Sequence, residues 1–197
     1  MNTLPHTRPS PIAGSWYPAD ADLLAAEING YLAAAALPAL KVTPLGLIAP
    51  HAGYFYSGAT AGYAYRTVQG LHFDLCVVAS PLHNYLPHPL LSSAHTAYAT
   101  PLGDVKIDHD LLSAFDKKLT QNGLPGIQLI GGDREHSLEI QLPFLQCALE
   151  GDFCLLPIMV RSSSASLLMG TGQILAELLQ DKKVLLVAST DLSQFVD

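Results

Sequence analysis

Three polar side chains follow short apolar runs that predict buried strands. His51, His83 and Asp191 each come just after such a run. In open α/β sheets, ligands gather beyond the carboxyl ends of the strands. Two histidines and one carboxylate with open positions form the ligand set of non-haem iron(II) sites, and similar sets hold other divalent metals. If the three strands are parallel and adjacent, we expect a metal site with His51 and His83 as ligands.

Each of these residues also has a simpler interpretation. Most single loop histidines are not ligands, and His88 and His95 lie close enough to His83 in the sequence to be the relevant residue instead. Asp191 could cap a following helix through Ser193 as readily as it could line a site. The matched placement of two histidines after two strands favours the functional interpretation.

The densest ionisable cluster of the chain spans residues 133–139. At helical spacing His136 and Glu139 share a face, so they could pair, and His136 could act as an acid, a base or a substrate anchor. An acidic helix N-terminus, which the helix dipole favours, is the structural alternative.

Aromatic residues 54–56 follow His51 and favour a lined pocket beside it. Because His136 could act as an acid or a base and Asp191 follows a strand end beside the expected metal, we predict that these two are catalytic residues. Tyr54 and Glu139 are predicted to bind the substrate.

Apolar runs alternate with helical patterns along the chain. Strands are expected at residues 42–49, 73–79, 153–160 and 183–189, an extended segment at 90–98, and helices at 20–37, 59–68, 108–119, 136–149 and 164–180. Pro143 must bend or restart the fourth helix. This alternation predicts an α/β fold, with a mostly parallel central sheet and helices on both faces. A chain of 197 residues is too short for two comfortable domains, so we expect a single domain over 1–197.

Composition excludes several classes of protein. Hydrophobic residues make up 49% of the chain and charged residues 14%, which is typical of a compact globule rather than a disordered chain. The net charge of −7 and the lack of a Lys/Arg cluster argue against a nucleic-acid partner. No apolar run reaches the roughly 18 residues of a membrane span, and no secretory signal is visible. Three cysteines without CxxC spacing suit a reducing compartment, so we expect a cytoplasmic protein with no membrane contact.

Four motifs occur in a fixed order along the chain. They are Ala13-Gly14-Ser15-Trp16-Tyr17-Pro18, Ala49-Pro50-His51-Ala52-Gly53-Tyr54, Glu135-His136-Ser137-Leu138-Glu139 and Ser189-Thr190-Asp191-Leu192-Ser193. Together they resemble the Memo family, whose members include AmmeMemoRadiSam system protein B, from about residue 10 to the end. The resemblance implies a fold similar to class III extradiol, or LigB-type, dioxygenases.

The resemblance also implies a redox-linked metal, iron or copper. It assigns His51 and His83 as ligands, places Asp191 in the pocket, and adds a cysteine ligand from the C-terminal third of the family. The chain departs from the family pattern at Gln141 and Gln194, where relatives carry histidine. Because the family continues beyond the point where this sequence stops, that cysteine is absent and we expect a domain that is incomplete at its C-terminus.

Three function classes follow from the sequence. The first is a metal-dependent redox enzyme related to dioxygenases, the second a non-catalytic binding or scaffold protein that uses the same pocket for a small molecule or peptide, and the third a metal-dependent hydrolase. The chain is expected to be either a fragment of a longer product or a short, degenerate member. In both cases a partner chain or a second copy would cover apolar surface at the incomplete C-terminal edge.

Overall fold

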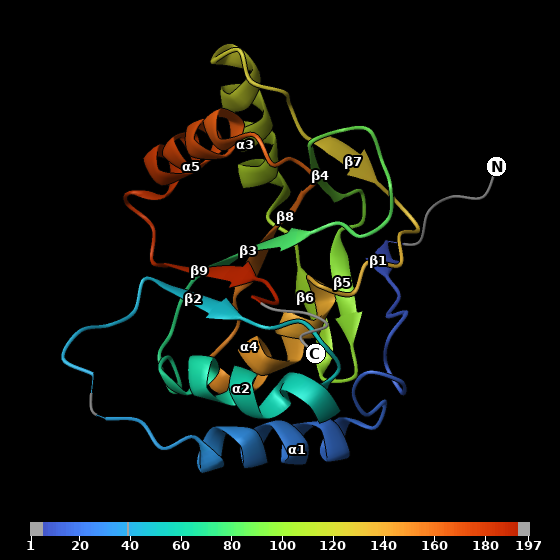
Figure 1. Ribbon diagram of the computed structural model, residues 1–197, viewed down its shortest axis with the longest axis vertical. Coiled ribbons are helices and arrows are strands. Elements are labelled where there is room, and N and C mark those ends of the chain that lie inside the picture. Colours follow the sequence, from blue (N-terminus) through green and yellow to red (C-terminus); the bar gives the residue numbers. More distant parts are fainter. Residues whose placement is uncertain (1–5, 39, 193–197) are drawn as a thin grey trace.

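A computed structural model of the chain describes residues 6–38 and 40–192. It contains a six-stranded sheet, a three-stranded sheet and five α-helices (Figure 1). In chain order the elements are β1 (Thr7–Arg8), α1 (Ala21–Ala34), β2 (Gly46–Ala49), α2 (Tyr54–Arg66), β3 (Leu75–Pro81), β4 (Leu90–Ser93), β5 (Ala97–Thr100), β6 (Gly103–Lys106), α3 (His109–Gln121), β7 (Gln128–Ile130), the 3-10 turn η1 (Glu139–Gln141), α4 (Leu142–Ala148), β8 (Cys154–Val160), α5 (Ala165–Leu179) and β9 (Val184–Ser189).

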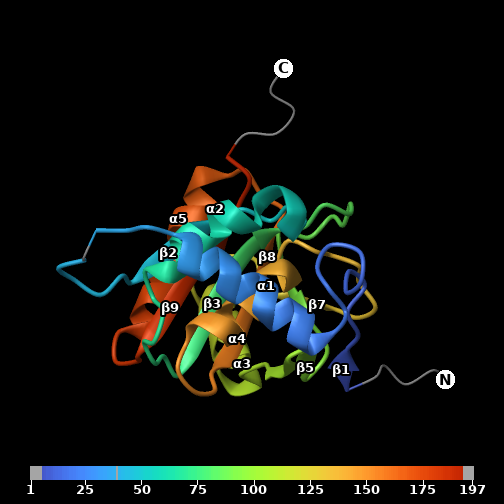
Figure 2. The ribbon, with the colours of Figure 1, turned by 90° about the horizontal axis from the view of Figure 1, so that it is seen from below.

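The larger sheet confirms the predicted fold class. Its strand order is β2-β9-β3-β8-β4-β7, and the one antiparallel pair in it is β4 with β8. Helices α1, α2 and α4 lie on one face and α3 and α5 on the other, as Figures 1 and 2 show from two directions. The smaller sheet, β1-β5-β6, lies beside this layer.

Helix starts follow the capping chemistry that the sequence indicates. Asp20, Asp108 and Ser164 cap α1, α3 and α5, because each side chain accepts a hydrogen bond from a backbone N–H in the first turn. Pro143 lies in the first turn of α4, directly after η1, so the predicted restart is confirmed. A proline is tolerated there because the first-turn N–H groups have no partner within the helix.

The start of helix α2 differs from the prediction because of packing that the pattern does not reveal. Helix α2 starts at Tyr54 rather than at residue 59, so Gly58 lies inside the helix instead of opening it. At Gly58 and Gly62 an added Cβ would collide with Tyr31 of α1. Glycine is needed there so that two helices can approach closely, not to end a helix.

The extended segment at 90–98 also divides into two strands. β4 pairs in the six-stranded sheet, whereas β5 pairs with β1 and β6 in the smaller one. Strand β2 is shorter than predicted and begins at Gly46. The single extended segment expected at 90–98 therefore crosses from one sheet to the other.

One face of the sheet carries exposed apolar side chains at its β2 edge. Leu47 and Val187 point inward and are buried, whereas Ile48 and Leu186, on the opposite face, are 62% and 40% exposed. The three cysteines are unpaired thiols. None of the helices in the described ranges combines the length and the apolar character that crossing a bilayer requires.

Candidate metal centre

The strands that carry the predicted site residues are neighbours in the sheet. β9 lies between β2 and β3, and all three run parallel. His51, His83 and Asp191 follow the carboxyl ends of these strands, so the condition set by the sequence is met. The Asp191 side chain also links two of these positions, because its Oδ1 accepts the backbone N–H of His51 at 2.8 Å.

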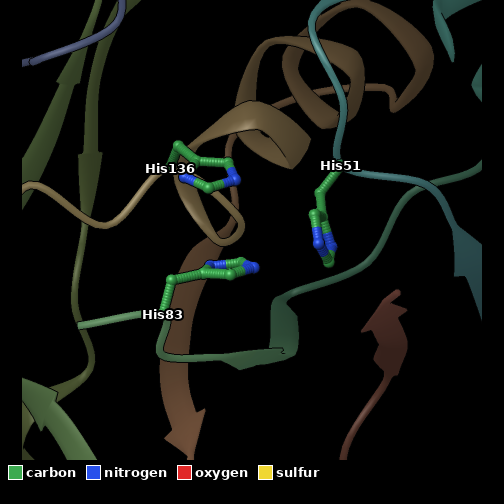
Figure 3. Close-up of side chains that lie close together, drawn as sticks. All are labelled: His51, His83 and His136. Carbon is green, nitrogen blue, oxygen red and sulfur yellow. The ribbon is translucent and has the colours of Figure 1, made fainter. Parts of the chain in front are cut away.

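Three histidine rings meet at this edge of the sheet. His51, His83 and His136 offer ligand nitrogens that all lie within 4.8 Å of one another (Figure 3). The rings of His83 and His136 are stacked, with centroids 4.6 Å apart, and His51 stands edge-on to both. The structure thus adds His136 to the pair of histidines expected from the strand ends.

His136 comes from an irregular segment rather than from a helix. The predicted helix at 136–149 begins only at η1, so His136 and Glu139 do not share a helical face and the pairing expected between them is not formed. Glu135 Oε1 accepts the backbone N–H groups of His136 and Ser137 at 3.0 and 2.9 Å. These bonds hold the segment in a turn and direct the His136 ring toward the strand ends.

Glu135 is also the hydrogen-bond partner of His83. Its Oε1 lies 2.9 Å from His83 Nδ1, and its Oε2 accepts the His83 backbone N–H at 2.6 Å. Burial alone would raise the pKa of Glu135, but the hydrogen bonds donated by His83 and Ser137 outweigh it and lower the pKa to about 2. Glu135 is therefore an ionised, buried acceptor next to the histidines.

His51 is 4% exposed and lies beneath the cavity. Its Nδ1 is 3.2 Å from Ser189 Oγ, and its Nε2 is 3.6 Å from Asp191 Oδ2. Burial lowers the pKa of His51, and the proximity of His83 adds to this, although Asp191 opposes it. Burial likewise lowers the pKa of His136. Both rings are thus neutral at neutral pH, the form in which imidazole binds metals.

A cavity of about 270 Å³ opens beside the histidines. It is lined by Ser15, Trp16, His51, Ala52, Gly53, Phe55, Tyr56, His136 and Asp191. The Trp16 ring packs on the His136 ring with centroids 4.2 Å apart. The cavity therefore has mainly apolar walls, two histidines and one carboxylate.

The two predicted substrate-binding residues do not line this cavity. Tyr54 is buried in the core, and its hydroxyl donates to the Ile140 carbonyl at 2.9 Å. Glu139 is fully buried and accepts hydrogen bonds from Arg8 and Tyr17. As placed, both side chains are engaged inside the protein rather than turned toward a ligand.

The alternatives left open for His83 are resolved by the geometry. His88 Nδ1 bonds the Leu90 carbonyl, and buried His95 accepts the Gly132 N–H, so neither belongs to the histidine cluster. Ser193 and Gln194, which bear on the capping role of Asp191 and on the departure from the family pattern, lie outside the described residues. The sequence marked residues 133–139 as chemically dense, but not which of them would reach the strand ends.

Known proteins match nearly the whole chain. The family described as Memo-like protein matches residues 8–197. A MEMO1 family protein of Nitrosopumilus maritimus is 30% identical over 93% of this chain and 67% of its own length, and one of Aquifex aeolicus is 34% identical over 94% and 66%. The yeast Saccharomyces cerevisiae has a MEMO1 family protein, MHO1, that is 32% identical over 93% of this chain and 58% of its own length. The chain spans about two thirds of the length of the first of these relatives, and less of the yeast protein.

Proposed function

Because this chain belongs to the Memo-like protein family, we propose that His51, His83 and His136 together bind one divalent transition-metal ion. The carrying observation is the convergence of three imidazoles from three separate parts of the chain (Figure 3). In a tetrahedral or octahedral site, two nitrogens bound to one metal at about 2.1 Å lie about 3.0–3.4 Å apart. The ligand atoms here lie within 4.8 Å of one another, so metal binding would require the rings to close by up to about 1.5 Å.

The donor set suits some metals better than others. Imidazole favours zinc, copper, iron and nickel over magnesium or calcium. We propose iron or copper, in line with the redox character that the family resemblance implies. When bound, such a metal supplies Lewis acidity and a one-electron couple.

The residues around the histidines have separate tasks in this proposal. Asp191 is 12% exposed and presents its Oδ2 to the cavity, where it can accept a proton from a ligand. Trp16 covers one side of His136 and reduces its access to water. Their arrangement supports a metal-dependent redox reaction on a small molecule or on one side chain of a peptide, since about 270 Å³ holds little more.

A non-catalytic binding role is the second candidate. Phe55 and Tyr56 at the cavity mouth are 88% and 82% exposed, and aromatic residues are enriched at protein interfaces. In that case the metal and the pocket would hold a partner without turnover. A screen for catechol oxygenation by metal-loaded protein separates the candidates, because only the redox enzyme would turn substrate over.

Metal content tests the shared part of both candidates. Protein purified without oxygen should contain about one iron or copper ion per chain, and His51→Ala should contain none above background. His72→Ala is the matched control, because His72 precedes β3 at its opposite end and bonds Asp74 and Glu150 instead. Background metal in the wild type, or equal loss in His72→Ala, would refute the proposal.

The exposed apolar face at β2 and β9 supports a partner expectation. We propose that another chain or a second copy covers Ile48 and Leu186, because exposed apolar patches mark interaction sites. Light scattering should then show an assembly larger than one chain that dissociates in Ile48→Lys. A monomeric wild type would refute the proposal that a second copy covers this face.

A further inference from the structure

We propose that Ser189 and Glu135 are positioning residues: each accepts a hydrogen bond from Nδ1–H, Ser189 from His51 and Glu135 from His83, and so keeps the hydrogen on Nδ1 and leaves both Nε2 atoms for the metal. The inference deepens the proposed metal site and rests on it for its purpose. Its first part, the tautomer of each ring, can be measured without any metal. A buried hydrogen-bond network connects His51 to a backbone carbonyl, a group that can only accept, through Ser189 and Gln141.

The starting point is the backbone carbonyl of Pro50, which can only accept. A side-chain nitrogen, Nε2 of Gln141, lies 2.9 Å from it, so the amide group of Gln141 must present its NH₂ there. The opposite end of the same amide, Oε1, accepts from the Tyr65 hydroxyl at 2.7 Å. The Pro50 carbonyl fixes the orientation of this side chain, which is 1% exposed, and the Tyr65 hydroxyl, which can donate, is consistent with it.

The second hydrogen of that NH₂ group reaches Ser189. Gln141 Nε2 donates to Ser189 Oγ at 2.7 Å, and the Ser189 hydroxyl donates its own hydrogen to the Ser137 carbonyl at 2.5 Å. A hydroxyl has one hydrogen and two lone pairs. Toward His51, Ser189 Oγ can therefore only accept.

The tautomer of His51 follows from this. Its Nδ1 lies 3.2 Å from Ser189 Oγ, so Nδ1 must carry the hydrogen. In a neutral ring Nε2 is then the bare nitrogen. Nε2 of His51 lies 3.6 Å from Asp191 Oδ2 at the cavity. The lone pair of this nitrogen and the carboxylate oxygen would together stabilise a cation bound between them.

His83 reaches the same tautomer by a different route. Glu135 accepts three backbone N–H groups, from His83, His136 and Ser137, at 2.6–3.0 Å. A carboxylate so surrounded by donors is an acceptor for His83 Nδ1 as well, at 2.9 Å. Nε2 of His83 is again the nitrogen left for a ligand.

Glu135 also links two of the proposed ligands. It holds the ring of His83 and the backbones of both His83 and His136, so one buried carboxylate sets the distance between two rings. Partners of this kind, which bond the far nitrogen of a ligating histidine, typically change metal affinity about 10–100-fold when removed.

The first experiment measures the tautomers directly. Long-range ¹H–¹⁵N spectra of metal-free protein labelled with ¹⁵N-histidine should show a protonated Nδ1 and a bare Nε2 for His51 and His83. A protonated Nε2 on either neutral ring would overturn the inference for that residue. This result does not depend on whether any variant folds.

The second experiment tests the positioning role with Zn²⁺ as the probe, titrated against a chromophoric chelator. Ser189→Ala should mix the His51 tautomers and weaken Zn²⁺ binding by about 10–100-fold, and Glu135→Gln should do the same for His83. Ser92→Ala is the matched serine control, because Ser92 is equally buried and donates to the Pro157 carbonyl of the neighbouring strand without touching a histidine. Glu177→Gln, at an exposed helix position, serves for the glutamate.

The outcomes separate two kinds of failure. Expected tautomers in a wild type that binds no metal would refute the proposed function and leave the tautomer assignment intact. Tight metal binding that survives Ser189→Ala and Glu135→Gln unchanged would refute the positioning role and leave the metal site intact.

Discussion

Glu135 and Glu139 lie four residues apart in the sequence, and their exposed fractions are 2% and 0%. Glu135 accepts N–H groups from the segment that carries the histidines, and its pKa falls to about 2. Glu139 pairs with the Arg8 guanidinium at 2.6 Å and accepts from Tyr17, and its pKa is raised because burial outweighs these partners. The same residue type thus serves the proposed metal site at one position and anchors the N-terminal segment at the other.

Burial raises the pKa of both acids, and their hydrogen-bond partners decide whether that effect is overcome, as at Glu135, or not, as at Glu139. Glu135 accepts hydrogen bonds from fixed backbone N–H groups, which need no positively charged partner, so it stays ionised in a buried position. Glu139 needs the Arg8 cation, which Asp133 also binds at 2.7 Å. A loss at Glu139 should therefore show in stability first, and a loss at Glu135 in the site.

The largest effect is expected from Glu139→Gln. It leaves the buried Arg8 charge with one partner fewer, and an uncompensated buried charge typically costs about 3–5 kcal/mol of unfolding free energy. Because Asp133 still pairs with Arg8, the loss should lie near the lower end of that range. Urea denaturation measures it. Glu27→Gln is the control, because Glu27 also accepts from a tyrosine hydroxyl, that of Tyr31, but forms no ion pair, so about 1 kcal/mol is expected. Equal losses in the two variants would remove the special role of the Arg8–Glu139 pair.

The second-largest effect is the loss of stability that protonation of Glu135 causes at low pH. Its folded pKa of about 2 lies below the usual 4.5, so its contribution is full above pH 4.5 and is lost as the pH falls from there toward 2. The shift corresponds to about 3 kcal/mol. Unfolding free energies of metal-free protein should fall more steeply with acid in the wild type than in Glu135→Gln. Parallel curves would contradict the low pKa.

The smallest effect is optical. Trp16 is the single tryptophan of the chain, and its ring lies 4.2 Å from the His136 ring. Paramagnetic Cu²⁺ bound at the histidines should quench its fluorescence, since such ions promote non-radiative relaxation of a nearby excited indole. Glu139→Gln should still show quenching at a slightly higher Cu²⁺ concentration, whereas Glu135→Gln should need far more. The reverse order would contradict the claim that Glu135 supports the metal site and Glu139 does not.

The sequence predicted the parts of the site that depend on strands. Apolar runs locate the carboxyl ends of β2, β3 and β9, and parallel pairing brings His51, His83 and Asp191 to one edge. The helices expected from residues 20, 108 and 164 begin within one residue of those positions in the structure, where Asp20, Asp108 and Ser164 cap them, because capping depends on local chemistry.

The parts that depend on irregular backbone could not be predicted. Helical spacing placed His136 with Glu139, but hydrogen bonds to the Glu135 side chain hold His136 ahead of the helix and turn it toward the strands. The partner of Glu139 is Arg8, 131 residues away in the sequence. Spacing carries no information about either contact. The sequence named His136 as a candidate catalytic residue, but its place beside His51 and His83 and the different partners of the two acids emerge only from the fold.

The most direct test of the central claim is a count of imidazole ligands by X-ray absorption on metal-loaded protein. Three histidine ligands are predicted for the wild type and two for His136→Ala, with His72→Ala unchanged at three. A wild-type count of two, or a count that His136→Ala leaves unaltered, would contradict a metal centre built from His51, His83 and His136.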